Sequence, residues 1–251
     1  LSMDSTWARI HFEGREGYVA VEYLSPFLPN FLVRQEEYQL PILHYQLGEE
    51  GILDALAQHI DRLKSDGFHL MTLRAFRSLV LTQEERDARL EPRSVAIVVS
   101  GITSNNVDEV AGVLRASGIA ATLFIQTKHI GISGITEQQI LSLVTNGMDV
   151  QSAGHTGDDM RSLTNEQINL ELAQSRALIE ELTSEPVFAV AYALGGVNER
   201  VIEKAALAGY LFGVGTAPDA DFTRDQFLRL PSLLVTSSMT GDDIVALVSS
   251  E

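Results

Sequence analysis

An apolar run at residues 95–99 is the feature that most constrains the fold of this chain. It reads Val-Ala-Ile-Val-Val and stops at Ser100 and Gly101, before a polar Thr-Ser-Asn-Asn segment. A strand with apolar side chains at every position is buried on both faces, as is typical of parallel sheets in α/β proteins. Such proteins bind ligands at the carboxyl ends of their strands. Ser100 and Gly101 therefore stand where a ligand site is expected, although their side chains offer little chemistry.

From residue 41 onward, predicted strands alternate with predicted helices. Short apolar runs indicate strands, and apolar positions at helical spacing indicate helices. Thr164 and Gln167 have the spacing of a capping box at the start of the longest helix. About seven βα units in about 210 residues favour a closed or nearly closed barrel over an open sheet. The expected strands are 42–46, 68–73, 95–100, 120–126, 148–151, 187–192, 210–214 and 227–235, and the expected helices are 52–63, 76–79, 107–116, 137–144, 164–182, 198–208 and one that begins at Gly241.

The chain before residue 41 has a different pattern. Residues 7–14 alternate in period two, residues 14–17 form a glycine-rich turn, and residues 18–24 can form a second strand, which together predict a β-hairpin. The following segment contains Pro26 and Pro29 and is interpreted as a linker. The expected organisation is a hairpin at 1–25, a linker at 26–40 and one main domain at 41–251.

Composition excludes several classes of function. The chain has 34 acidic and 18 basic residues, and this charge of -16 argues against nucleic acid or an anionic membrane as a partner. No run reaches the roughly 18 apolar residues that span a bilayer, so we expect no membrane insertion. The absence of cysteine excludes thiolate catalysis and restricts any metal to His, Asp or Glu ligands. The sequence begins without the basic and apolar regions of a secretory signal.

Six segments of the main domain occur in a characteristic order. One of them reads Asn-Gly-Met-Asp-Val-Gln-Ser-Ala-Gly-His-Thr, at residues 146–156. The series resembles the NodB-type polysaccharide deacetylases over roughly residues 41–248. The resemblance implies an α/β fold, a distorted (β/α) barrel, and removal of acetyl groups from N-acetylglucosamine units by a metal bound to Asp, His and His. The segments that carry it are 41–46, 93–101, 118–125, 146–156, 163–172 and 191–201.

The metal-binding motifs of that family are altered here. The resemblance places Ser100 at the position of the catalytic base and Gly101 at that of a metal ligand, so both carboxylates are missing. His155 matches the first His of a His-Thr-x-x-His motif, and Asp159 replaces the second His. One His and one Asp fall short of the three protein ligands of a catalytic zinc site. We expect no bound metal, with a divalent metal such as zinc at His155 and Asp159 as the alternative.

The resemblance also assigns the remaining site positions. The family's Pro-Tyr-Gly loop corresponds to residues 193–195, so the backbone N–H of Leu194 is the candidate donor to an oxyanion, and Tyr192 is a candidate substrate contact. The acid His near the C-terminus is replaced by Thr236, and the His that ends the first strand in part of the family is replaced by Gln46. The metal ligand candidate His155 is thus the one intact side chain.

Other chemistries receive less support from the sequence. We interpret His44, on the first strand, as a packed polar residue. Ser100 lies in Val-Val-Ser-Gly-Ile, which lacks the Gly-x-Ser-x-Gly motif of serine hydrolases. No glycine-rich phosphate loop follows a predicted strand, which argues against a nucleotide site.

Three hypotheses of function follow. The first is a deacetylase-like domain that no longer catalyses and binds a bacterial cell-wall or exopolysaccharide glycan containing N-acetylglucosamine. The second is an active carbon-nitrogen hydrolase with a rearranged site at His155 and Asp158 or Asp159. The third is a structural or protein-binding domain. Residues 7–24 resemble the last strands of bacterial SH3-like domains, and an extracellular or cell-surface location rests only on these resemblances.

Overall fold

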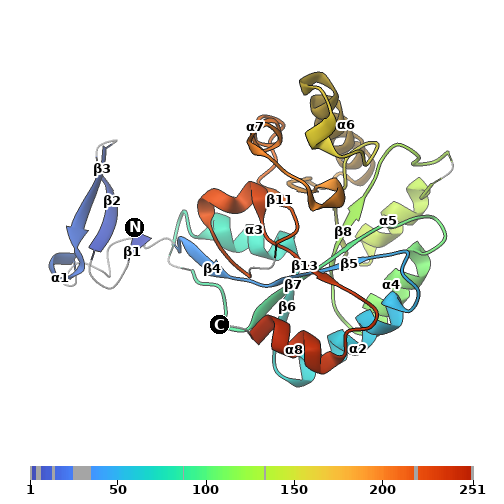
Figure 1. Ribbon diagram of the computed structural model, residues 1–251, viewed down its shortest axis with the longest axis horizontal. Coiled ribbons are helices and arrows are strands. Elements are labelled where there is room, and N and C mark those ends of the chain that lie inside the picture. Colours follow the sequence, from blue (N-terminus) through green and yellow to red (C-terminus); the bar gives the residue numbers. More distant parts are fainter. Residues whose placement is uncertain are drawn as a thin grey trace.

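A curved sheet of parallel strands forms the centre of the computed structural model (Figure 1). The structure describes residues 2–3, 7–12, 15–24, 35–86, 88–132, 134–217 and 220–249. All neighbouring strands of this sheet pair in parallel, as expected for strands buried on both faces. In spatial order they are β11 (Phe212–Val214), β10 (Ala189–Ala191), β9 (Asp149–Ser152), β8 (Thr122–Ile125), β7 (Ser94–Ser100), β5 (Ile42–Gln46) and β13 (Leu233–Val235).

One segment, residues 230–235, links the two edges of this sheet. Leu230 forms a parallel bridge with Val214 in β11, whereas β13 pairs with β5. An additional strand, β6 (His69–Met71), pairs with the first part of β7. The expected distorted (β/α) barrel is therefore confirmed.

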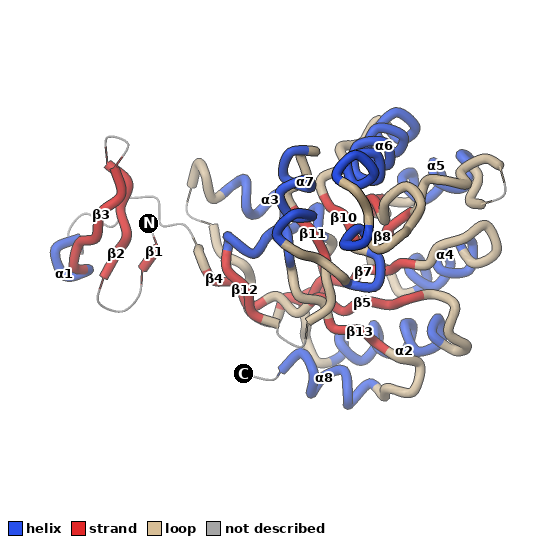
Figure 2. The backbone as a smooth tube through the Cα atoms, turned by 45° about the horizontal axis from the view of Figure 1, so that its top comes forward, coloured by secondary structure: helices blue, strands red, loops and turns tan. Residues whose placement is uncertain are grey.

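Six helices surround the outer face of the sheet, and Figure 2 shows them around the central strands. They form a chain of contacts in the order α8, α2, α4, α5, α6 and α7. A further helix, α3 (Leu73–Thr82), packs on the inner face. The outer helices are α2 (Ile52–Ser65), α4 (Val107–Ala116), α5 (Glu137–Thr145), α6 (Asn165–Thr183), α7 (Glu199–Leu207) and α8 (Gly241–Ser249).

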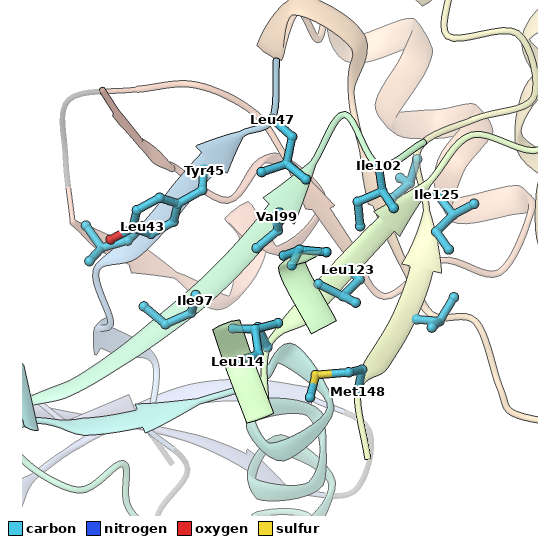
Figure 3. Close-up of a cluster of buried hydrophobic side chains, with 14 of the residues drawn as sticks. Leu43, Tyr45, Leu47, Ile97, Val99, Ile102, Leu114, Leu123, Ile125 and Met148 are labelled. Atoms are coloured by element: carbon cyan, nitrogen blue, oxygen red, sulfur yellow. The ribbon is translucent and has the colours of Figure 1, made fainter. Parts of the chain in front are cut away.

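The sheet separates two hydrophobic clusters. In β7, Val95, Ile97 and Val99 face the outer helices, and Figure 3 shows Ile97 and Val99 in that outer cluster. The intervening residues Ala96 and Val98 belong to the inner cluster. Because side chains alternate along a strand, Ser100 also faces the inside of the barrel. The last side chain of β7, that of Ser100, therefore points into the barrel.

Several sequence predictions match the structure closely. Strand β7 is buried at every position, as its apolar run predicts. Helix α4 has the predicted bounds, residues 107–116. The predicted capping box is present. The side chain of Thr164 accepts the backbone N–H of Gln167, and the side chain of Gln167 accepts the backbone N–H of Thr164.

The expected strand at 227–235 is wrong. Residues Arg224–Arg229 form a 3-10 helix that buries Phe227, and only Leu233–Val235 form a strand. The ring of Phe227 packs at 5.3 Å from Phe212 in an aromatic cluster on the inner face. Burial of this ring therefore outweighs the apolar pattern that suggested one long strand.

The expected linker at 26–40 contains a strand that packs on the barrel domain. Residues Glu37–Gln39 form β4, which pairs antiparallel with β12 (Asp221–Thr223), a strand that the sequence does not predict. Tyr38 is fully buried, and its ring stacks on Phe222 at 5.7 Å. This buried aromatic pair holds residues 37–39 on the barrel domain. Residues 26–34 of the expected linker lie outside the described part.

The N-terminal hairpin is present, with different bounds from those expected. Strands β1 (Ser2–Met3), β2 (Trp7–Phe12) and β3 (Arg15–Ala20) form a three-stranded antiparallel sheet, which Figure 1 shows to one side of the barrel. Phe12 pairs with Arg15, and residues 15–17 of the expected turn lie in β3, whereas Gly14 lies outside the described residues. The expected end of that strand is a short helix, α1 (Val21–Leu24), which buries Leu24.

None of the helices in the described ranges is both long enough and apolar enough to cross a bilayer.

Candidate functional site

A cavity of about 720 Å³ opens at the carboxyl ends of the strands. We call this cavity the barrel mouth. Among the residues that the structure describes, its walls include no Asp, Glu, Lys or Arg side chain. Polar side chains come from β5, from β7 and from the loops after the strands, and apolar ones come mainly from the strands and loops on either side of β5 and β7. The lining residues are His44, Gln46, Ser100, Gly101, Ile102, Thr103, Phe124, Gln126, Ala153, Gly157, Ala191, Tyr192, Ala193, Leu194, Gly195, Thr216 and Leu234.

The alternation of side chains along the strands explains why His44, Gln46 and Ser100 meet in the barrel mouth. In β5, His44 and Gln46 lie on the same face as Ile42, which belongs to the inner cluster. In the paired register, His44 is opposite Val98 and Gln46 is opposite Ser100. The sequence alone favours a packed polar role for His44, although its position two residues before Gln46 places both side chains on the same face of β5.

These side chains form a continuous row of hydrogen bonds. Nε2 of His44 lies 2.6 Å from Oγ of Ser100, and the Ser100 hydroxyl is 2.6 Å from Oε1 of Gln46, to which it donates. On the other side of the imidazole, Nδ1 lies 3.4 Å from Oγ of Ser232. The Ser232 hydroxyl donates to the carbonyl oxygen of Gly215 at 2.5 Å. We call Gln46, Ser100 and His44 the polar floor of the barrel mouth, and Ser232, which is fully buried and does not line the mouth, lies next to His44.

Burial lowers the pKa of His44 to about 4. The imidazole is therefore uncharged at neutral pH, and every member of the polar floor is neutral. The floor can donate and accept hydrogen bonds but provides no charge to pair with an ionic ligand.

The lowered pKa of His44 predicts a loss of stability in acid. The unfolded chain binds a proton below about pH 6.5, whereas folded His44 does so only near pH 4. As pH falls from 6.5 to 4, the free energy of unfolding should therefore fall by up to about 3 kcal/mol more in the wild type than in His44→Gln. Urea denaturation at several pH values measures this difference. Parallel pH profiles for the two proteins would contradict it.

The loop after β9 holds His155, and the carboxylate of Glu171 fixes this loop. Glu171, on α6, is only 4% exposed and accepts the backbone N–H of His155 at 2.8 Å and that of Thr156 at 2.9 Å. Nδ1 of His155 lies 2.9 Å from the hydroxyl oxygen of Thr127. His155 is held beside the barrel mouth and does not line it.

Asp159 forms an ion pair with the neighbouring side chain of Arg161. Its two carboxylate oxygens accept hydrogen bonds from Nε and Nη2 of Arg161, the shorter at 2.7 Å. These hydrogen bonds from Arg161 hold the pKa of Asp159 below its usual range. The carboxylate is thus committed to a local bidentate pair.

The other predicted positions divide between the mouth and its surroundings. Leu194 lines the mouth with an 86% exposed side chain, and its φ of 56° lies in the left-handed region that a leucine rarely adopts. Tyr192 also lines the mouth, but its hydroxyl donates to the carbonyl oxygen of Leu228 at 2.8 Å. Thr236 lies outside the lining, and its hydroxyl is 3.0 Å from that of Ser238.

A family model described as polysaccharide deacetylase matches residues 87–213, about half of the chain. The chain belongs to the polysaccharide deacetylase family. Bacillus subtilis YxkH, whose name assigns it to the same family, is 29% identical over 221 residues, which cover 84% of this chain and 77% of YxkH.

Solved structures of polysaccharide deacetylases share this fold. The deacetylase PplD of Streptococcus pyogenes superposes with a TM-score of 0.72 at 16% identity, over 86% of this chain and all of PplD. BC0361, a polysaccharide deacetylase from Bacillus cereus, gives 0.72 at 20% identity, over 94% of this chain and 72% of its own. At these identities the likeness concerns the fold alone.

The polysaccharide deacetylase family generally uses a divalent metal, and the residues of this chain do not fit one. Of the three positions that the family resemblance assigns to metal ligands, Gly101 has no side chain and Asp159 is paired with Arg161. Across the described ranges, no three His, Asp or Glu side chains come together in a way that could hold a metal ion. A catalytic zinc site needs three such ligands. We therefore derive no chemistry through a metal.

Proposed function

We propose that this chain is a deacetylase-like carbohydrate-binding domain that no longer catalyses metal-dependent deacetylation. The ligand is a bacterial cell-wall or exopolysaccharide glycan that contains N-acetylglucosamine, and the place of action is outside the cell or at its surface. One observation carries the proposal: the barrel mouth has the volume and position of a ligand site, but the described residues that line it are neutral and include no metal-binding set.

The surfaces of the barrel mouth suit an uncharged sugar. Sugar rings present hydroxyl and acetamide groups together with apolar faces, and pockets for small molecules combine apolar walls with a few polar groups that fix orientation. Here the polar floor supplies the hydrogen-bonding groups, and Phe124, Leu194 and Leu234 supply apolar walls. In this proposal the N-terminal sheet is an SH3-like fragment that contributes attachment to the cell surface.

Activity and binding assays separate this function from an active hydrolase. We expect N-acetylglucosamine oligomers and peptidoglycan fragments to yield no acetate above the blank with zinc, with cobalt or without metal. Calorimetry should show binding of the oligomers without metal, and equal binding by His155→Ala. Metal-dependent acetate release that His155→Ala abolishes would refute the proposal in favour of a rearranged hydrolase site at His155 and Asp159.

A matched pair of variants tests whether the glycan occupies the barrel mouth. Leu234 lines the mouth and is 49% exposed, so Leu234→Glu adds a charge to its wall and removes little buried surface. Leu207, at the end of α7, is 73% exposed and does not line the mouth, so Leu207→Glu is the control. We expect Leu234→Glu to weaken binding by about tenfold or more, the effect of one desolvated polar group. Equal loss in both variants would contradict this location.

A further inference from the structure

The amide of Gln46 presents a free hydrogen-bond donor to the barrel mouth. Its Oε1 accepts the Ser100 hydroxyl at 2.6 Å, which turns Nε2 away from that bond. Within the described ranges, Nε2 of Gln46 has no hydrogen-bond partner, and the side chain is exposed at the end of β5. An NH₂ group of this kind pairs with a carbonyl oxygen of a ligand.

Among the described residues, the barrel mouth offers no negatively charged side chain that could pair with a cation. No carboxylate among the described residues lines it, and the nearby carboxylates of Asp159 and Glu171 already accept hydrogen bonds from Arg161 and from the loop after β9. An ammonium group has donors and no acceptor, so it cannot accept a hydrogen bond from Gln46. Moving such a charge out of water without a partner is costly.

We propose that the barrel mouth recognises the acylation state of an amino sugar, with Gln46 as the specificity-determining residue. This inference rests on the proposed function and names the group that the same site reads. Nε2 of Gln46 donates to the carbonyl oxygen of an N-acetyl group, and the neutral walls disfavour the ammonium group of the deacetylated sugar. The domain therefore binds glycans that retain their acetyl groups.

The charge of the whole chain acts in the opposite direction. A net charge of -16 attracts a polycationic, deacetylated glycan to the surface of the protein without any contact in the mouth. Salt screens such long-range attraction, whereas a buried hydrogen bond to a neutral group depends little on salt. Selectivity of the mouth is consequently measured at high salt.

Calorimetry with two matched ligands tests the proposal. The probes are oligomers of N-acetylglucosamine and of glucosamine of equal length, in about 0.5 M salt at about pH 6, where an amino group is charged and His44 is neutral. The wild type should bind the acetylated oligomer at least about tenfold more tightly, as one well-placed hydrogen bond and one unpaired charge imply. Equal affinity for the two oligomers would overturn the inference.

The substitution Gln46→Glu supplies the decisive comparison. It keeps the side-chain size and the bond from Ser100 but replaces the NH₂ donor with a carboxylate oxygen. We expect the preference for the acetylated oligomer to fall by about tenfold or more, with a gain in affinity for the glucosamine oligomer. Gln174→Glu, an exposed position on α6, adds the same charge away from the mouth and should leave the preference unchanged.

The outcomes separate the two proposals. If neither oligomer binds the wild type, both the proposed function and the inference fail. If both oligomers bind equally and Leu234→Glu abolishes binding, the barrel mouth is a glycan site without this selectivity. If Gln46→Glu and Gln174→Glu have the same effect, selectivity comes from overall charge and not from Gln46.

Discussion

Replacement of Asp149 by alanine is expected to lower the free energy of unfolding by about 3–5 kcal/mol, because it leaves buried donors without their acceptor. Asp149 is 2% exposed at the start of β9 and accepts the backbone N–H and Nε–H of Arg74, each at 3.0 Å. It also accepts the hydroxyl of Thr122 at 2.9 Å and the amide of Gln151 at 2.8 Å. This carboxylate thus joins α3 to the first residues of β8 and β9.

The same arginine provides the control for Asp149→Ala. Nη1 of Arg74 also pairs with Glu185 at 3.1 Å, but that carboxylate is 46% exposed. Removal of an exposed partner should cost less than about 1 kcal/mol. Urea denaturation of Asp149→Ala and Glu185→Ala measures the contrast. A similar loss in the two variants would mean that burial of the carboxylate contributes nothing to the effect.

The pKa of Asp149 shows the balance behind this prediction. Burial raises the pKa of the carboxyl group, and the guanidinium of Arg74 opposes that rise. The raised pKa means that burial of the ionised carboxylate costs free energy, which its hydrogen bonds to buried donors offset. A substitution that keeps an acceptor oxygen for those donors should therefore cost less stability than one that removes it. We expect Asp149→Asn, which keeps the volume and one acceptor oxygen, to lose less stability than Asp149→Ala.

Local signals in the sequence predict much of the fold. The apolar run before Ser100 predicts β7, and the spacing of Thr164 and Gln167 predicts the start of α6. These signals succeed because burial on both faces and helix capping depend on neighbouring residues. Pairing between distant segments leaves no such local signal, which explains why the partnership of β4 with β12, 182 or more residues apart in the chain, was not predicted.

The candidate site shows the same division. Period-two alternation was sufficient to place His44 and Gln46 on one face of β5, but the register that brings them beside Ser100 of β7 is a property of the folded sheet. The pairing of Asp159 with Arg161 lies within two residues, yet the sequence does not show whether the carboxylate turns toward Arg161 or toward a ligand. Resemblance to the family proposes these positions as a site, and the contacts of their side chains describe what each can bind.

Replacement of Glu171 by alanine should lower both stability and glycan affinity. Glu171 lies buried in the first half of α6. Its carboxylate accepts the backbone N–H groups of His155 and Thr156, and also the Thr156 hydroxyl at 2.5 Å. Without it, buried donors lose their acceptor, and we expect a loss of about 3 kcal/mol in the free energy of unfolding. Urea denaturation measures this loss, and Glu181→Ala, at an exposed position of the same helix, should change stability by less than about 0.5 kcal/mol.

The loop is built closely around this carboxylate. Gly154 has a φ of 82°, and a Cβ atom at this position would lie 2.9 Å from Oε2 of Glu171. A glycine is therefore required both by the left-handed backbone and by the close approach of the acid. Because Ala153 and Gly157 of the same loop line the barrel mouth, a displaced loop changes the wall that faces the ligand.

Binding and stability measurements separate the effect of Glu171→Ala on glycan affinity from its effect on folding. Calorimetry with N-acetylglucosamine oligomers, at a temperature where the variant remains folded, should show weaker binding than Glu181→Ala. Glu171→Gln keeps the side-chain volume and one acceptor oxygen, so it should recover part of the stability and part of the affinity. If Glu171→Ala loses stability but binds the oligomers as the wild type does, then the loop after β9 supports the fold without shaping the glycan site, and the ligand contacts must come from the other residues that line the barrel mouth.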